Sequence, residues 1–211
     1  MGEYLQKFFE STAGQVVTVI IILVMMFFIV RRSKDKKVDV KALAISALLI
    51  ALAIILEQIK LFEMPQGGSV TLFGTLPIIL CAYLLGTRSG VLAGMCVGLL
   101  NLMFGPYIIH PVQMLMDYPL AFGAMGLAGL AREQKNGLTK GYIIGVLGRY
   151  VCAVLSGVIF FGSYAPEGFS ALTWSLWYNI TYLAVEGIGT IIVINLPPVK
   201  NAIERIRTQV E

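Results

Sequence analysis

Residues 41–59 read KALAISALLIALAIILEQI, a stretch in which Lys41 and Glu57 are the only charged side chains. A helix needs about 20 mainly apolar residues to cross the hydrocarbon core of a bilayer. The stretch has this length and composition, so it predicts a membrane-spanning helix.

Apolar runs of similar length recur on both sides of this stretch. They lie near 14–31, 70–86, 89–105, 110–131, 141–161 and 173–195. The runs at 70–86 and 89–105 are separated by so few residues that they predict a tight helical hairpin. We therefore expect an all-α membrane protein with one extra N-terminal transmembrane helix and basic linker (1–41), followed by a six-helix membrane domain (42–211).

The composition points to the same class. Only 13% of the residues are charged, whereas soluble domains have about 25%, and 57% are hydrophobic. The mean hydropathy is +0.82. A soluble enzyme, a disordered tail and a nucleic-acid-binding protein are therefore excluded, despite a net charge of +4. The three cysteines, Cys81, Cys96 and Cys152, lie inside apolar runs and are interpreted as packing residues.

The basic residues predict the orientation in the membrane. If the N-terminus is outside, thirteen of the sixteen Lys and Arg residues lie on the cytoplasmic side, as the positive-inside rule requires. They are Arg31, Arg32, Lys34, Lys36, Lys37, Lys41, Arg88, Arg132, Lys135, Lys140, Lys200, Arg205 and Arg207. The first apolar run ends in a basic pair, the reverse of the order in a secretory signal, so we expect it to be retained. The sequence predicts a multi-pass cell-membrane protein with its C-terminus in the cytoplasm.

Four ionisable residues fall inside the predicted helices, namely Glu57, Asp117, Arg149 and Glu186. Charge at membrane depth is costly and therefore suggests function. If Arg149 pairs with one carboxylate, the surplus is acidic and suits a cationic ligand. Two explanations without a ligand are equally open: Glu57 lies at the membrane interface, and Arg149 joins two helices through an ion pair with a carboxylate.

Polar and aromatic residues follow helical spacing in two of the predicted helices. His110, Gln113 and Asp117 are placed at i, i+3 and i+7, on one helix face. Trp174, Tyr178 and Tyr182 are spaced by four, and Asn179 and Glu186 lie on an overlapping face. Together the two stripes predict a pocket near the outer leaflet that holds a flat cation by stacking and cation–π attraction. Anchoring at the membrane interface is the alternative for the aromatic residues.

Recognisable enzymatic motifs are missing from the sequence. It has no phosphate-binding loop, no metal-ligand cluster around His110 and no Ser-His-Asp pattern. We therefore expect a protein that is not an enzyme and that captures a solute without its own energy source.

Small residues repeat at intervals of four in two of the helices. Gly86, Gly90, Gly94 and Gly98 have this spacing, and for Gly90 to Gly98 close packing inside the protein is favoured over a partner surface. Ala47 and Ala51 have the same spacing, which by itself fits internal packing and a partner surface equally well.

Four motifs, in order, resemble the thiamine-specific S components (the ThiT family) of energy-coupling factor transporters. They are Met64-Pro65-Gln66-Gly67-Gly68-Ser69, His110-Pro111-Val112-Gln113 with Asp117-Tyr118, Arg149-Tyr150 with the segment 156–166, and Tyr178-Asn179 with Tyr182. The resemblance spans roughly residues 42–196.

The resemblance implies a six-helix bundle that binds thiamine from outside. It also implies docking on a coupling membrane protein and two ATPases that use ATP, with no cofactor in this chain. At the matching positions, Asp117 would take the aminopyrimidine with Tyr118 beside it, while Asn179, Trp174 and Phe161 would complete the site. Ala47 and Ala51 match the family's docking motif, and a loop around residues 60–69 would close over the ligand.

Two positions depart from the family pattern. Many members carry His where this chain has Ala153, and some carry Glu at the position of Asp117. An S component for another pyrimidine or cationic vitamin precursor is therefore an alternative. A stand-alone transporter in which Asp117 and Glu186 shuttle protons is another.

Overall fold

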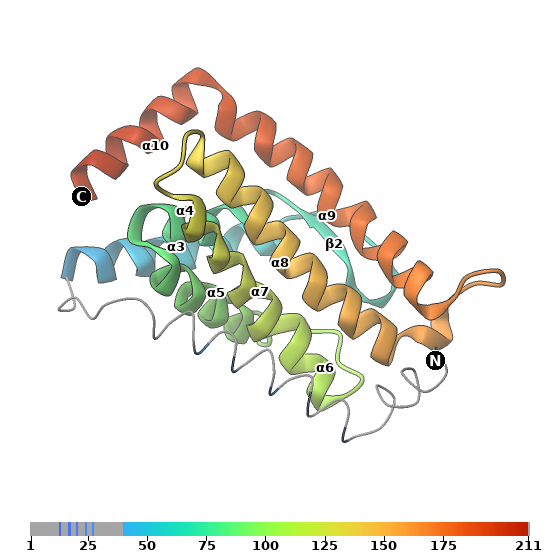
Figure 1. The fold of residues 1–211 in the computed structure, drawn as a ribbon. Helices are drawn as coiled ribbons and strands as arrows, with labels where there is room; N and C mark the ends of the chain where they lie inside the picture. Colours follow the sequence, from blue (N-terminus) through green and yellow to red (C-terminus); the bar gives the residue numbers. More distant parts are fainter. Residues whose placement is uncertain are drawn as a thin grey trace.

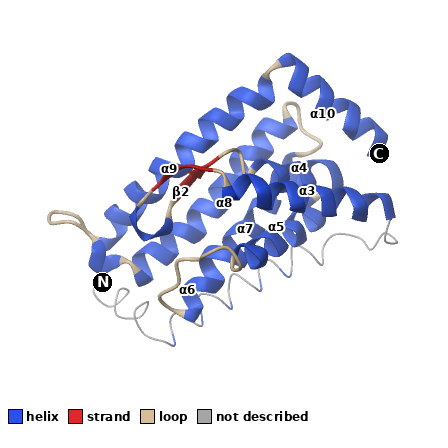
Figure 2. Ribbon diagram, turned by 180° about the vertical axis from the view of Figure 1, so that it is seen from behind, coloured by secondary structure: helices blue, strands red, loops and turns tan. Residues whose placement is uncertain are grey.

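The computed structural model describes residues 40–210 and, before them, the single positions Ala13, Val17, Ile20, Val24 and Phe27. Those positions apart, the predicted leading helix at 14–31 and its basic linker lie outside the described residues. Residues 40–210 form an elongated helical bundle with a small two-stranded hairpin beside one end (Figures 1 and 2).

The elements follow the predicted apolar runs in order along the chain. They are α3 (Val40–Gln58), β1 (Lys60–Glu63), β2 (Ser69–Thr71), α4 (Leu76–Leu85), α5 (Thr87–Asn101), α6 (Pro111–Leu115), α7 (Ala121–Ala124), α8 (Gly137–Phe160), α9 (Ala171–Asn195) and α10 (Pro197–Val210). In the described residues, four helical stretches are long and apolar enough to cross a membrane: α3, the stretch 111–131, α8 and α9. The predicted multi-pass membrane bundle is confirmed.

The stretch 111–131 is helical but changes its winding three times. Between α6 and α7 it widens into a π-helical turn, η2 (Met116–Leu120), and after α7 it tightens into the 3₁₀ segment η3 (Met125–Ala131). Pro119 lies in the π turn. Because proline has no N–H and its ring clashes with the preceding turn, it disturbs the regular hydrogen-bond ladder. The widening places Asp117 and Tyr118 in irregular backbone.

The prediction of one helix over 70–86 is wrong at its N-terminal part. Residues 69–71 pair with β1 as an antiparallel strand, and α4 begins only at Leu76. The backbone between β2 and α4 is held by a side chain of another helix: the Glu186 carboxylate accepts hydrogen bonds from the N–H groups of Thr71 and Thr75. The N–H groups of Leu72 and Phe73 donate to the Ile59 and Thr71 carbonyls, so these backbone donors are satisfied without a regular helix. A ten-residue helix spans only about 15 Å, so α4 does not cross the bilayer alone.

The C-terminal helix α10 also lies outside the predicted elements. It folds back from α9 along the end of the bundle opposite the hairpin (Figure 1). Ile203 is buried in the core, and Arg207 donates to the Tyr83 hydroxyl at 3.0 Å and to the Arg132 carbonyl at 2.9 Å. These contacts tie α10 to α4 and to the loop before α8. We call this the α10 end and the other the hairpin end.

The glycine repeat packs inside the bundle, as its spacing predicts. A Cβ on Gly90 would lie 2.3 Å from the Ala82 Cβ, and one on Gly94 would lie 2.1 Å from the Phe122 carbonyl oxygen. At Gly98 the corresponding distance, to the Tyr118 carbonyl oxygen, is 2.4 Å. No side chain fits at such distances, so α5 approaches α4 and the stretch 111–131 at backbone contact.

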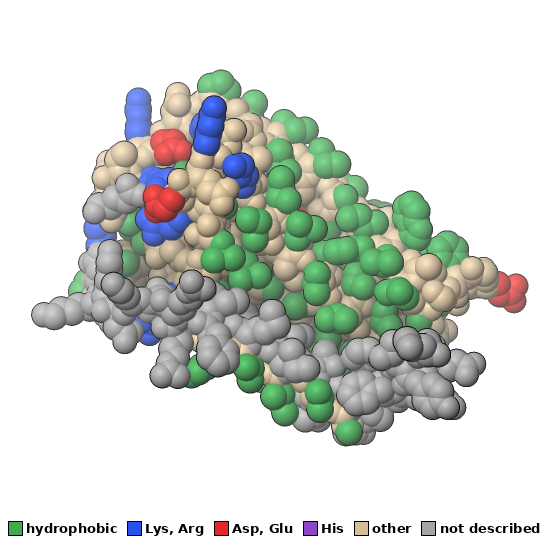
Figure 3. Space-filling model, viewed as in Figure 1, with side chains coloured by type: hydrophobic (Ala, Val, Ile, Leu, Met, Phe, Trp, Pro, Cys, Tyr) green, Lys and Arg blue, Asp and Glu red, His purple; other side chains and the backbone are tan. Residues whose placement is uncertain are grey.

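The surface divides into an apolar belt and a basic end. Hydrophobic side chains cover the middle of the visible face, whereas Lys and Arg gather near the α10 end (Figure 3). On α3, Leu48 and Ile55 are 70% and 60% exposed. Ala47 and Ala51 are exposed on the same helix. The small-residue pair of α3 therefore faces outward, unlike the glycines of α5.

Gly94→Ala is expected to lower the free energy of unfolding by about 1–3 kcal/mol, because the new methyl group would overlap the backbone of α7. Gly187→Ala is the matched control, since its Cβ would meet only the Tyr142 Cε1 at 3.8 Å in another helix. Thermal unfolding of the purified proteins in detergent measures both. Equal melting temperatures for Gly94→Ala and the unchanged protein would contradict backbone contact at this position.

Candidate binding site

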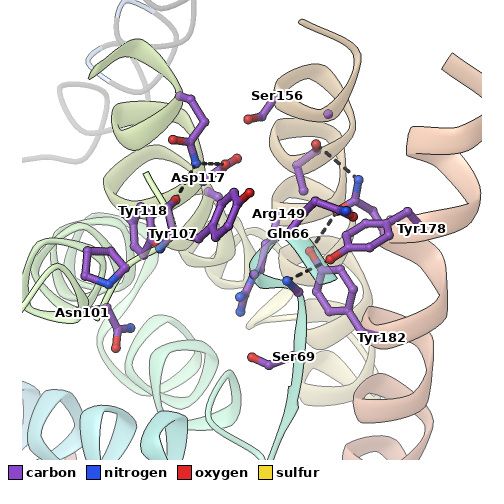
Figure 4. Close-up of a pocket in the computed structure, with 18 of the residues that line it drawn as sticks. Gln66, Ser69, Asn101, Tyr107, Asp117, Tyr118, Arg149, Ser156, Tyr178 and Tyr182 are labelled. Atoms are coloured by element: carbon purple, nitrogen blue, oxygen red, sulfur yellow. Dashed lines mark hydrogen bonds between the residues drawn. The ribbon is translucent and has the colours of Figure 1, made fainter. Parts of the chain in front are cut away.

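A cavity of about 170 Å³ lies at the hairpin end of the bundle. Its walls come from the hairpin, the ends of α3 and α5, the stretch 104–122, α8 and α9 (Figure 4). The lining side chains include Glu57, Gln58, Lys60, Gln66, Asn101, Tyr107, Gln113, Asp117, Tyr118, Phe122, Arg149, Ala153, Ser156, Phe161, Trp174, Tyr178, Asn179 and Tyr182. This volume greatly exceeds the space that one water molecule needs.

One wall of the cavity presents a carboxylate held by an amide. Gln113 is 2% exposed, and its Nε2 donates to Asp117 Oδ2 at 2.6 Å and to the Tyr107 carbonyl at 3.1 Å. The Gln113 Oε1 accepts from the Ile109 N–H at 3.2 Å. Gln113 thereby fixes Asp117 and the preceding loop relative to each other, and an acceptor stands at the cavity wall.

Tyr118, next to Asp117, fixes the same loop from the π turn. Its hydroxyl accepts from the Tyr107 N–H at 2.9 Å. The Tyr107 ring lies 6.0 Å from that of Phe161, measured between centroids. A hydrogen bond with Tyr164 raises the pKa of Tyr107 above its ordinary value. These contacts bring the loop before α6 against the end of α8.

The opposite wall is an aromatic stripe on α9. Trp174, Tyr178 and Tyr182 follow one another with centroid distances of 6.0 Å at each step. Asn179 lies on the same side and donates to the Ser175 carbonyl at 2.9 Å and the Ala153 carbonyl at 3.3 Å, while it accepts from the Tyr182 hydroxyl at 2.9 Å. The predicted convergence of the two helix faces is therefore present.

A buried ion pair lies deeper in the cavity wall. Arg149 Nη1 is 3.6 Å from Glu57 Oε1, and the Arg149 guanidinium stacks at 4.3 Å on the Phe122 ring. Both side chains line the cavity. This pair is neutral as a whole, and Lys60, the other cation in the lining, is paired with Glu63 at 2.7 Å, so Asp117 leaves the cavity with a surplus of negative charge.

Three buried polar atoms of residues that line the cavity make no hydrogen bond within residues 40–210. They are Glu57 Oε1, Asn101 Nδ2 and Ser156 Oγ. The Asn101 Oδ1 accepts from Gln58 Nε2 at 3.2 Å, so the amide is oriented while its donor is free. A buried donor without a partner costs about 1–3 kcal/mol, so a polar group is expected opposite it when the site is filled.

Two residues from the predicted stripes do not line the cavity. His110 caps α6: its Nδ1 accepts from the Val112 N–H at 3.2 Å, and its ring stacks on Phe160 at 5.2 Å. Glu186 lies below Tyr182 on α9, and both carboxylate oxygens are occupied by Thr71 and Thr75. His110 and Glu186 thus hydrogen-bond to groups of the protein outside the cavity.

The structure brings together seven of the eight residues that the sequence assigned to the site: Gln113, Asp117, Tyr118, Phe161, Trp174, Asn179 and Tyr182. That they bind a ligand stays a prediction. Asn101, Gln58 and Tyr107 were missed, since each lies near the end of an apolar run, where polar residues are common. Within the described residues, no group of three or more His, Cys, Asp or Glu side chains could hold a metal ion.

Comparison with known proteins gives one consistent set of relatives. Residues 43–205 match the family model described as thiamine transporter protein (Thia_YuaJ). A protein named thiamine transporter ThiT from Bacillus subtilis is 37% identical over 166 residues, 71% of this chain and 86% of that protein. One of the same name from Lacticaseibacillus paracasei is 30% identical over 141 residues, 59% of this chain and 70% of its own length.

Among solved structures, that of ThiT from Listeria monocytogenes is similar, with a TM-score of 0.65 and 27% identity. The similarity covers 74% of this chain and 94% of the Listeria chain. The described bundle thus has the fold of a solved member of this family.

Glu57→Gln is expected to lower the free energy of unfolding by about 3–5 kcal/mol, because it leaves the Arg149 guanidinium buried without a counter-charge. Glu63→Gln is the matched control: Glu63 pairs with Lys60 at 2.7 Å, but its side chain is 64% exposed. That change should cost less than about 1 kcal/mol. Thermal unfolding in detergent compares the two, and an equal loss of stability would show that the Arg149 pair contributes no more than a surface pair.

Proposed function

Because this chain belongs to the thiamine transporter family, we propose that it is a substrate-binding S component that takes up thiamine. The observation that carries the proposal is the cavity between Asp117 and the aromatic stripe of α9. Seven residues that the family resemblance and the helix faces single out meet in that cavity. The names of the relatives support thiamine as the substrate.

The cavity matches the chemistry of thiamine at both of its rings. The aminopyrimidine offers an amine donor, and the Asp117 carboxylate, steadied by Gln113, is an acceptor for it. The thiazolium carries a fixed positive charge, which the rings of Trp174 and Phe161 can hold by stacking, worth about 0.5–2 kcal/mol per contact. The surplus negative charge of the site favours one cation over a neutral or anionic solute.

We further propose that the hairpin end faces the outside and the α10 end the cytoplasm. The described Lys and Arg residues that gather near the α10 end support this orientation, since cytoplasmic ends are enriched in them (Figure 3). The cavity then receives its substrate from outside. The loop around residues 60–69 is the hairpin, whose turn contributes Gln66, Gly67 and Gly68 to the lining, which supports a role of this loop in closing the site.

Energy for transport is proposed to come from partner subunits, a coupling membrane protein and two ATPases. Ala47 and Ala51 are exposed on α3, where two small side chains one turn apart let a partner helix approach closely. The sequence holds no phosphate-binding loop of its own. A docking role of this pair fits both facts.

One residue favours a related substrate as a second candidate. Ala153 lines the cavity and supplies only a methyl group where many family members carry a ring. A smaller pyrimidine or another cationic vitamin precursor would lose less from this change than thiamine. Competition of hydroxymethylpyrimidine against labelled thiamine separates the two. A proton shuttle through Glu186 is less suited to the structure, since Glu186 lies outside the lining and is fully engaged by Thr71 and Thr75.

Thiamine is expected to quench the fluorescence of Trp174 and Trp177 in the purified protein, and Asp117→Asn to weaken binding by about ten- to a hundredfold. The reason is the loss of a charge-assisted hydrogen bond, worth about 1.5–3 kcal/mol. Glu167→Gln removes an exposed carboxylate that does not line the cavity and should leave the dissociation constant unchanged. No quenching at millimolar thiamine would reject the substrate, and unchanged affinity in Asp117→Asn would reject the site.

Ala47→Leu combined with Ala51→Leu is expected to abolish thiamine uptake by cells while purified protein still binds thiamine. The two leucines would fill the groove on α3 without touching the cavity. Leu48→Ala on the same helix is the control, because it removes bulk from an exposed position. Copurification of the coupling protein and both ATPases with each variant measures docking directly. Full uptake by the double variant would show that the partners bind elsewhere.

A further inference from the structure

The hairpin tip, residues 65–68, contributes Gln66, Gly67 and Gly68 to the cavity wall. Gln66 and Gly67 both have positive φ, 62° and 91°, and together they reverse the chain between β1 and β2. The tip contains a short 3₁₀ turn, η1 (Pro65–Gly67), and the Met64 N–H donates to the Gly68 carbonyl at 2.7 Å. A short two-stranded hairpin is marginally stable alone, so the position of its tip depends on contacts with the bundle.

Tyr178 of α9 supplies two polar contacts to that tip through one oxygen atom. Its hydroxyl accepts from the Gly68 N–H at 3.0 Å and donates to the Pro65 carbonyl. The approach is close: a Cβ on Gly68 would lie 2.7 Å from the Tyr178 hydroxyl oxygen. Figure 4 shows the Tyr178 hydroxyl directed toward the hairpin, above Tyr182. Another contact from α9, Thr181 to the Met64 sulfur at 3.5 Å, is weak.

The root of the hairpin is held far more firmly by the same helix. Glu186 accepts four hydrogen bonds, from the N–H and hydroxyl groups of Thr71 and of Thr75, at 2.8–3.2 Å. All four are buried and go to a carboxylate, which makes them stronger than bonds between neutral groups. The Tyr178 contacts are neutral and lie at the rim. The tip is therefore held less firmly than the root.

From this asymmetry we propose that the Tyr178 hydroxyl is a latch, a positioning group that sets how fast the hairpin tip uncovers the cavity. The proposal rests on the proposed function, in that the cavity is where the solute binds. The hydroxyl is engaged by the tip on both its donor and its acceptor side, so it acts on the hairpin and not on the ligand. Glu186 is the fixed point about which the tip moves.

Tyr178→Phe tests the latch, since it keeps the ring in the cavity wall and removes only the hydroxyl. In ligand-free protein, hydrogen exchange of the peptide covering residues 64–69 should become faster by about tenfold, the effect of losing about 1 kcal/mol or more of net hydrogen bonding. Tyr150→Phe is the matched control, because its hydroxyl donates to the Leu176 carbonyl at 3.1 Å, away from the hairpin. It should leave this exchange unchanged.

Stopped-flow fluorescence with thiamine tests the consequence for the ligand. If the latch governs access, Tyr178→Phe raises the association and dissociation rate constants by a similar factor, and the dissociation constant changes by less than about threefold. Gly68→Ala should give the same acceleration, since the added methyl group displaces the tip from Tyr178. Combining the two changes should add little to either one.

The outcomes are distinct. Unchanged exchange in Tyr178→Phe would overturn the latch, as would a faster exchange with unaltered thiamine rates. A rise in the dissociation rate alone would overturn it too, because it would mark Tyr178 as a ligand contact. If the unchanged protein binds no thiamine, the proposed substrate fails, while hydrogen exchange still decides whether Tyr178 holds the tip.

Discussion

Backbone polar groups inside a bilayer need partners, because lipid offers none. The bundle leaves regular helical geometry at two places that matter, and in each a side chain from a helix supplies the missing partner. Glu186 holds the segment between β2 and α4. Gln113 and Tyr118 hold the loop before α6. The loop before α6 lines the cavity, and so does the hairpin that leads into the segment held by Glu186. Both sets of hydrogen bonds therefore help to position parts of the cavity wall.

Much of the bundle could be predicted from apolar run lengths, because a span needs a fixed number of residues. The hairpin and the short α4 could not, since the N–H groups of Thr71 and Thr75 are satisfied by Glu186, more than a hundred positions away in the chain. Nor could the winding of the stretch 111–131, where Pro119 acts on a helix whose outline is otherwise regular. Local pattern gives the approximate positions of the apolar helices, and distant partners decide where each one begins and ends.

The candidate site, like the fold, could be predicted from the sequence only in part. Helix spacing correctly placed Asp117 and Gln113 on one face, and the residues of α9 on another, because 3.6 residues per turn fixes which side chains align. It also placed His110 and Glu186 on those faces, yet both are used to satisfy nearby backbone. Periodicity reports which way a side chain points, not what it meets there. Asn101 shows the converse, as its isolated position at the end of α5 gave no periodic signal.

One straight helix, α9, carries the aromatic wall, the contact with the hairpin tip and the anchor of the hairpin root, at Trp174, Tyr178 and Glu186. These three side chains lie on one helix, and the hairpin contacts that helix at two levels, its tip at Tyr178 and its root at Glu186. A rotation of α9 about its own axis would move all three side chains together. The position of the hairpin and the aromatic wall of the cavity are therefore coupled. A movement of α9 at its C-terminal end, where α10 begins, would therefore also move the hairpin and the aromatic residues that line the cavity.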